Sequence, residues 1–201
     1  MTHRRSPLGL AAADSVRTWI RQQPWVTTCP AWPVPIQTWI ISAGLGLTIR
    51  WFPPDLPIPA ALHGMTLNSP DDDLHYTMWI NPNDSPLVQR FTLAHEFSHV
   101  LLGHLMANGP PAFSAILEVE ANTAAAELLL PWPLLAPRLP HRPMTTPTAW
   151  ARWWTAHGQG IVRQAEVSPA VLYYHCIDLG YLDANIPLRP SRASPTFAAL
   201  P

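Results

Sequence analysis

Residues 90–102 read RFTLAHEFSHVLL and contain the pattern H-E-x-x-H, which is typical of zinc hydrolases. On a helix, residues four apart lie on one face, so His95 and His99 can present their imidazoles to one ion. Glu96 then faces the open side of that ion, where it can act as the general acid-base of peptide hydrolysis. The flanking residues are mostly apolar, which predicts a buried helix. Buried His and Glu are costly unless they are paired or bound to metal.

A catalytic zinc site normally has three protein ligands, so a third ligand is expected downstream. A metzincin site would need Gly at position 102 and His at position 105, but Leu102 and Leu105 stand there and His104 is out of register. The remaining source is a glutamate on the helix that residues 116–131 predict.

The helical wheel of residues 116–131 distinguishes the glutamates of that helix. At about 100° per residue, Asn122 falls within about 40° of Glu118, whereas Glu120 and Glu127 fall on the opposite side. We therefore predict that Glu118 is the third ligand and that Asn122, one turn later, orients a ligand histidine through its other ring nitrogen. Glu120 and Glu127 are expected on a solvated face, with Glu120 as the alternative ligand.

The two segments together resemble the ImmA/IrrE family of metallopeptidases. The recurring family patterns, R-F-T-L-A-H-E-x-x-H-x-L-L and E-x-x-A-N-x-x-A-A-x-L-L-x-P, are matched by residues 90–102 and 118–131, and weaker elements extend the resemblance over roughly residues 34–186. The resemblance implies a gluzincin-like core with ligands His95, His99 and Glu118 and with Glu96 as the catalytic residue. It also implies cleavage of a helix-turn-helix repressor, which relieves repression in phages, mobile elements or stress responses.

The segments around the two motifs predict an α+β, zincin-like core. Three strands are expected at residues 47–52, 61–67 and 74–80, forming a small antiparallel sheet packed on the H-E-x-x-H helix. Zincins pair an extended substrate with an edge strand. We assign that role to the third strand, and its substrate-facing residues are expected to be His75, Tyr76, Thr77 and Met78.

Pro-rich segments suggest the division of the chain. Residues 1–33 are expected to form an N-terminal helix and a connector, 34–137 the peptidase-like core, 138–186 a C-terminal helical unit resembling a helix-turn-helix, and 187–201 a disordered tail. The second helix of that unit, residues 170–179, has no Arg or Lys, so it would bind phosphate poorly. We expect it to serve packing or partner docking.

Composition narrows the possible partners and location. The net charge is −1, and all 12 basic residues are arginines without a long basic run, which disfavours direct binding of nucleic acid. No convincing signal peptide and no apolar run of about 20 residues is present, so no membrane association is expected and a cytoplasmic location is predicted.

These observations predict a metal-dependent endopeptidase of limited specificity that binds one ion per chain. Zinc is expected, with manganese as an alternative, because two histidines and a glutamate suit several divalent ions. The alternative function is a non-catalytic protein that binds a repressor, as in a toxin-antitoxin pair. For the group that stabilises the oxyanion, the sequence does not choose among His75, Tyr76, His104, Tyr173 and His175.

Overall fold

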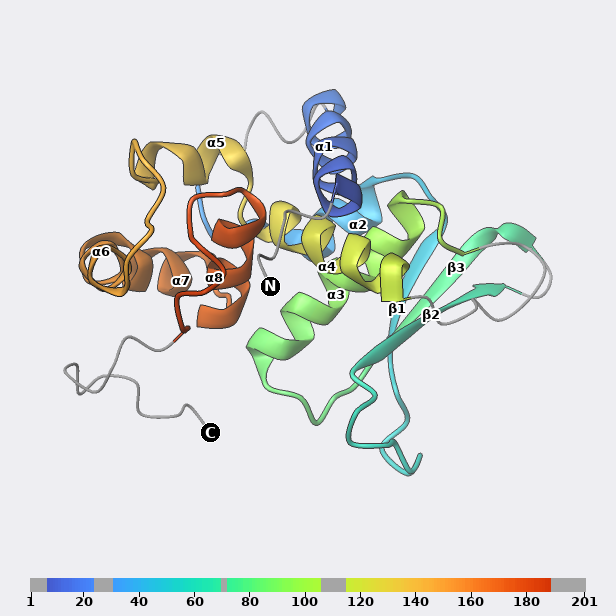
Figure 1. Cartoon of the computed structure of the whole chain (residues 1–201). Coiled ribbons are helices and arrows are strands. Elements are labelled where there is room, and N and C mark those ends of the chain that lie inside the picture. Colours follow the sequence, from blue (N-terminus) through green and yellow to red (C-terminus); the bar gives the residue numbers. More distant parts are fainter. Residues whose placement is uncertain (1–6, 24–30, 70–71, 106–114, 189–201) are drawn as a thin grey trace.

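The computed structural model describes residues 7–23, 31–69, 72–105 and 115–188. The sequence Asn108-Gly109-Pro110-Pro111 predicts a break after the H-E-x-x-H helix. These four residues and nearly all of the predicted tail lie outside the described residues. In chain order (Figure 1), the elements are α1 (Pro7–Gln22), α2 (Ile36–Ser42), β1 (Leu47–Trp51), β2 (Gly64–Ser69), β3 (Asp72–Ile80), α3 (Pro86–Leu101), α4 (Ala115–Leu129), α5 (Trp132–Leu135), the 3₁₀ helix η2 (Ala136–Arg138), α6 (Pro147–Trp153), the π-helical turn η3 (Trp154–Gly158), α7 (Gln159–Ala165) and α8 (Pro169–Asp178).

The three strands form one sheet in the order β1-β3-β2. The predicted α+β class with a three-stranded sheet is confirmed, but the sheet is mixed. β2 pairs antiparallel with β3, whereas β1 pairs parallel with it, Leu47 opposite Tyr76 and Trp51 opposite Ile80. The expectation of a purely antiparallel sheet is wrong because two chain reversals, through β2, separate β1 from β3 and bring β3 back in the direction of β1.

The assignment of the third strand as the sheet edge is also wrong. β3 lies in the middle of the sheet, and Tyr76, Thr77 and Met78 each pair with a residue of β1 on one side and of β2 on the other. Met78 is fully buried, and His75 is exposed. Because its backbone groups are used by both neighbours, β3 cannot accept a further strand. The edge strand beside α3 is β2.

Helix α3 lies in the core, as its apolar flanks predict. Leu93, Ala94 and Phe97 are buried, and the ring of Phe97 meets that of Trp19 edge-on at a centroid distance of 5.3 Å. The helix begins at Pro86, a residue suited to a first turn because it has no N–H to leave unpaired. Its sequence predicts a helix as far as about Met106, but the helix ends at Leu101 because Gly103 adopts φ +69° and reverses the chain.

Helix α1 packs along α4 and covers the face of α4 that was expected to be solvated (Figure 1). Glu127 is fully buried there, and its carboxylate accepts hydrogen bonds from Arg17 Nη2 at 2.8 Å and from the backbone N–H of Trp132 at 2.9 Å. The prediction of a wet face for Glu127 is therefore wrong. The helical wheel of α4 could not predict this, because the cation, Arg17, comes from another helix, α1.

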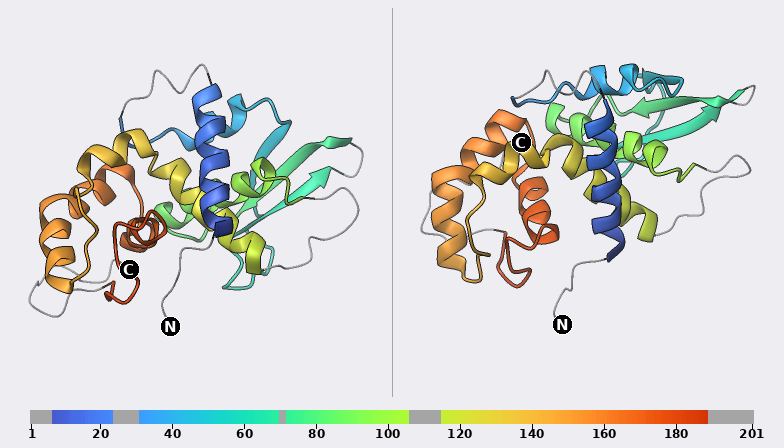
Figure 2. Two further views of the ribbon diagram at one scale, coloured as in Figure 1. Left: turned by 45° about the horizontal axis from the view of Figure 1, so that its top comes forward. Right: turned by 90° about the horizontal axis from the view of Figure 1, so that it is seen from above.

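The C-terminal helices α6, α7 and α8 gather on the side of α4 away from the sheet (Figure 2). Helix α7 ends at Ala165 and is followed by Glu166, which adopts φ 52°, and α8 begins after Ser168, whose hydroxyl accepts from Val171 N. This gives the predicted helix, turn and helix. Helix α8 packs against α4, one of the two helices that carry the sequence motifs. Among the described residues, no helix is both long and apolar enough to cross a membrane.

Candidate metal centre

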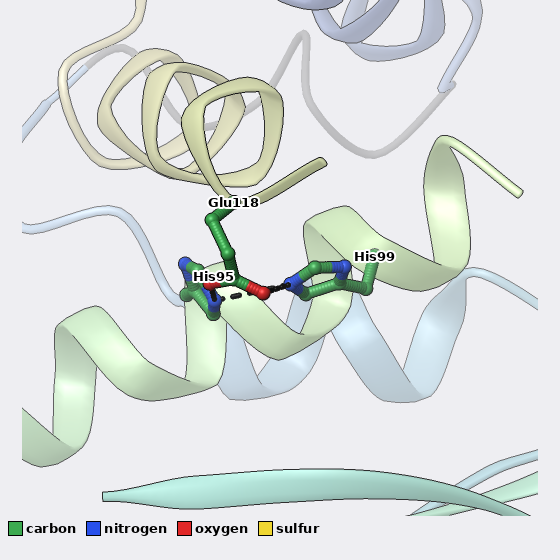
Figure 3. A group of neighbouring side chains, drawn as sticks. All are labelled: His95, His99 and Glu118. Atoms are coloured by element: carbon green, nitrogen blue, oxygen red, sulfur yellow. Dashed lines mark hydrogen bonds and ion pairs between the residues drawn. The ribbon is translucent and has the colours of Figure 1, made fainter. Parts of the chain in front are cut away.

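Three side chains from α3 and α4 converge on one point (Figure 3). His95 and His99 lie one turn apart on α3, and Glu118 reaches toward them from the first turn of α4. The two Nε2 atoms are 3.1 Å apart, and the Glu118 oxygens lie 3.3 Å from His95 Nε2 and 3.5 Å from His99 Nε2. Among the described residues, these three side chains form the one group of three or more His, Cys, Asp or Glu residues whose ligand atoms lie close enough together to hold an ion.

The spacing and chemistry of these three atoms fit a divalent metal ion. Ligand bonds of about 2.0–2.1 Å in a tetrahedron place neighbouring ligand atoms about 3.3 Å apart, which is the separation found here. Burial lowers the pKa of His95 and lowers that of His99 to about 4, with further lowering of the His99 pKa by the neighbouring histidines. Neutral imidazoles offer lone pairs at neutral pH, so the set suits zinc and also manganese.

Asn122 holds the first histidine. Its Oδ1 lies 3.0 Å from His95 Nδ1, one helical turn after Glu118 on α4. An amide oxygen can only accept, so Nδ1 carries the proton and the lone pair of His95 is directed to Nε2. The turn of α4 that presents Glu118 thus also fixes the tautomer of the neighbouring ligand.

The second histidine is held by a chain of contacts that sequence reasoning missed. His104 Nδ1 lies 3.0 Å from His99 Nδ1, and His104 Nε2 lies 3.2 Å from Glu120 Oε2. With His99 Nε2 directed to the centre, His99 Nδ1–H donates to His104, and His104 Nε2–H donates to Glu120. The positive φ of Gly103 returns the chain to the helix end. The Gly103-His104 pair after the active helix is therefore the sequence signal from which this contact could have been predicted.

Glu96 lies beside the three candidate ligands and is held by the edge strand. Thr66 Oγ1 on β2 donates to Glu96 Oε2 at 2.7 Å. Burial raises the pKa of Glu96 to about 7, and the negative charge of Glu118 adds to this while the Thr66 bond opposes it. A carboxyl with a pKa near neutrality can both take and return a proton.

Gly64 allows β2 to approach α3 this closely. A Cβ atom at Gly64 would lie 2.5 Å from Thr92 Cγ2 and 2.9 Å from the carbonyl oxygen of Trp79, both shorter than van der Waals contact. A side chain here would push the strand away from the helix. The absence of a side chain at Gly64 is therefore needed to bring Thr66 within hydrogen-bonding reach of Glu96.

An open cleft of about 540 Å³ lies over the centre. One wall is β2, through Gly64, Met65, Thr66 and Leu67, and the floor carries His95, Glu96, His99 and Glu118. The unpaired side of β2 thus borders the cleft, in the position that was expected of β3. Leu67 remains about half exposed at its rim.

Among the five oxyanion candidates, His104 contacts a member of the centre, through His99. Tyr173 is buried and its hydroxyl donates to the carbonyl of Ile186, while His175 lies fully buried 3.6 Å from Glu127. His75 and Tyr76 belong to the central strand and are absent from the lining of the cleft. No member of the set is selected by these contacts.

Comparison with known proteins assigns the chain to a family. The family model described as IrrE N-terminal-like domain (Peptidase_M78) matches residues 58–173, more than half of the chain, and the match includes β2, β3, α3 and α4. No curated protein matches the chain. The family is one of metallopeptidases, and its metal dependence agrees with the ligand atoms gathered by α3 and α4. The chain therefore belongs to the ImmA/IrrE family of metallopeptidases.

Proposed function

We propose that the protein is a metal-dependent endopeptidase of limited specificity, in which His95, His99 and Glu118 hold one zinc or manganese ion. The observation that carries the proposal is the convergence of these three ligand atoms within 4.8 Å, beside Glu96 and on the floor of an open cleft. When bound, the ion would polarise the scissile carbonyl and make a water molecule more acidic.

Glu96 acts as the general base and then as the general acid. Thr66 occupies its Oε2, which leaves Oε1 to take a proton from the attacking water. The same oxygen then donates this proton to the leaving nitrogen as the C–N bond of the tetrahedral adduct breaks, so that the amine leaves as a neutral group. Thr66 therefore acts as a positioning residue, because it limits the rotation of the Glu96 carboxyl.

The substrate lies along β2 in an extended conformation. The outer side of β2 has N–H and C=O groups that β3 does not use, and residues 64–67 border the cleft beside Glu96. A peptide that adds to this edge places its own backbone across the metal centre. This mode of binding requires a substrate segment that can extend along an edge strand. Cleavage is therefore restricted to exposed or loosely folded regions of a protein.

We infer from the family resemblance that the natural substrate is a helix-turn-helix transcriptional repressor, whose cleavage relieves repression in a phage, a mobile element or a stress response. A cytoplasmic location is part of this proposal. Helix α8 contains no Arg or Lys, which favours contact with a protein over contact with DNA.

The proposal is tested by Glu96→Gln, which removes the base but keeps the shape of the side chain and all three ligands. Purified wild type and variant are compared for bound metal and for cleavage of unfolded casein and of the repressor encoded beside the gene. We expect equal metal content and a fall in cleavage rate of about 10²- to 10⁴-fold. Thr155→Val, an exposed hydroxyl remote from the cleft, serves as the control. If Glu96→Gln relieves repression as well as wild type in cells, the non-catalytic binding function replaces the peptidase.

A further inference from the structure

A second cavity lies beside the cleft, between the first half of α3, the middle of α4 and α8. It encloses about 570 Å³. Phe91, Thr92 and Asn122 line both this cavity and the cleft, and Asn122 is the residue that contacts His95. A peptide bound in the cleft can therefore extend one side chain into the second cavity while its backbone stays at the metal centre.

The walls of this cavity are mostly apolar, and one end carries a carboxylate. Leu87 and Val88 of α3 and Val171 and Tyr174 of α8 contribute apolar surface, and Tyr174 is 60% exposed. Asp178, in the last turn of α8, is the acidic residue of the described lining. That lining contains no arginine, and the whole chain contains no lysine.

Asp178 is held weakly by the protein itself. Its described partner is the hydroxyl of Thr123 at 3.4 Å, but that hydroxyl has one hydrogen and lies closer, at 3.0 Å, to the carbonyl oxygen of Val119. None of the ion pairs in the described part of the chain includes Asp178. Burial raises the pKa of Asp178 to about 6, which still leaves the carboxyl mainly ionised at pH 7.

A long basic side chain complements this arrangement. The methylene stem of Arg or Lys can lie along the apolar walls while its charged end meets the carboxylate. An apolar side chain of the same length would instead cover Asp178 without giving it a partner, and a desolvated unpaired carboxylate is costly. The cavity therefore discriminates between the two kinds of side chain through one residue.

We propose that this cavity is a specificity pocket for an arginine or lysine side chain of the substrate next to the scissile bond, with Asp178 as the counter-charge. The assignment of the occupant to a substrate rests on the proposed peptidase function. Binding of a basic side chain does not require catalysis, so the two can fail separately.

The first test measures binding of N-acetyl-arginine amide and N-acetyl-norleucine amide by NMR titration of the full chain. The variants are Asp178→Asn, which removes the charge and keeps the shape, and Asp178→Glu, which keeps the charge. Asp55→Asn, an exposed loop residue, is the charge-matched control. We expect the arginine compound to bind wild type and Asp55→Asn with equal affinity and to bind Asp178→Asn about tenfold or more weakly. Asp178→Glu should restore this affinity at least in part. The norleucine compound should bind Asp178→Asn at least as tightly as wild type, because an uncharged amide costs less to cover than a carboxylate.

The second test identifies cleavage sites by mass spectrometry in a proteome digest made with a protease that cuts after acidic residues, so that Arg and Lys remain internal. Wild type should favour Arg or Lys at one position flanking the cut, and Asp178→Asn should lose this preference. Equal binding of both compounds by wild type, or an unchanged preference in Asp178→Asn, would overturn the pocket assignment while leaving the peptidase intact. Selective binding of the arginine compound without any cleavage would overturn the peptidase and retain the pocket.

Discussion

Helix α4 carries two glutamates with opposite environments. Glu127 is fully buried and is neutralised within the protein by Arg17 of α1 and the backbone N–H of Trp132. Glu118, on the other side of the helix, has a side chain that is 36% exposed and faces two imidazoles. The carboxylate of Glu127 is paired with a cation of the protein itself. The carboxylate of Glu118 faces only neutral imidazoles, so its counter-charge has to come from a bound cation. The comparison separates a structural ion pair from a proposed metal ligand on one helix.

The largest expected effect is the loss of metal binding when Glu118 is replaced by Ala. This change removes one of the three proposed protein ligands. Structural zinc sites have binding free energies of about 10–16 kcal/mol, and we expect the loss of one ligand to remove about 3–4 kcal/mol of such a binding free energy. The affinity for metal would then fall by about two to three orders of magnitude. Competition with a chromophoric chelator measures the affinity. Glu127→Ala, if it folds, should bind metal like wild type, and equal weakening in both variants would contradict the division between the two carboxylates.

The reverse effect is expected for stability without metal. Glu127→Gln removes the buried carboxylate partner of Arg17 and leaves it paired with the exposed Asp14 alone, which should lower the free energy of unfolding by about 3 kcal/mol. Glu118→Gln should change it by no more than about 0.5–1 kcal/mol, because that side chain is partly solvated. Urea unfolding followed by circular dichroism, with metal removed by chelation, gives both values. A destabilisation of similar size in the two variants would show that Glu118 also has a structural role.

A smaller effect is expected from the contacts behind His99. His104→Phe removes the acceptor of the His99 Nδ1–H, and Glu120→Gln removes the negative charge that polarises His104. We expect each change to weaken metal binding by about 10- to 100-fold, the usual effect of residues that hold a metal-binding histidine. The matched control is His141→Phe, an exposed histidine outside the centre. Metal affinity unchanged in both variants would leave His104 and Glu120 with a packing role only.

The smallest effect is the pH dependence of stability that comes from His175, which lies beside Glu127. Burial, with the charge of Arg17, lowers the pKa of His175 to about 3, against about 6.5 in the unfolded chain. The unfolded chain therefore binds the extra proton between these values, so the His175 contribution is intact above pH 6.5 and declines as pH falls toward 3. Between pH 7.5 and 5.5 the loss is about 1.4 kcal/mol.

Comparing wild type with His175→Gln isolates this term from the other titrating groups, including Arg17 and Glu127, which face His175, and Asp178. Asp178 works in the opposite direction, because its raised pKa favours the folded state at lower pH. The difference in unfolding free energy between the two proteins should shrink as the buffer is taken from pH 7.5 to pH 5.5. A difference that is constant over this range would mean that His175 is protonated in the folded protein as readily as in the unfolded chain.

The sequence alone determined the features that depend on local periodicity. The four-residue spacing places His95 and His99 on one face, and the 100° step along α4 separates Glu118 and Asn122 from Glu127. The apolar flanks predicted that α3 is buried. These inferences need only the geometry of a single helix, and a helix has the same geometry wherever it packs.

The tertiary structure decided which surface each element covers. The order β1-β3-β2 makes β2 the edge of the cleft, and α1 converts the expected solvated face of α4 into the buried Arg17–Glu127 pair. The turn at Gly103 brings His104 back to His99, and α8 closes the cavity that contains Asp178. Such contacts join residues far apart in the chain or across a turn. Periodicity within one element contains no information about the partner that will lie against it.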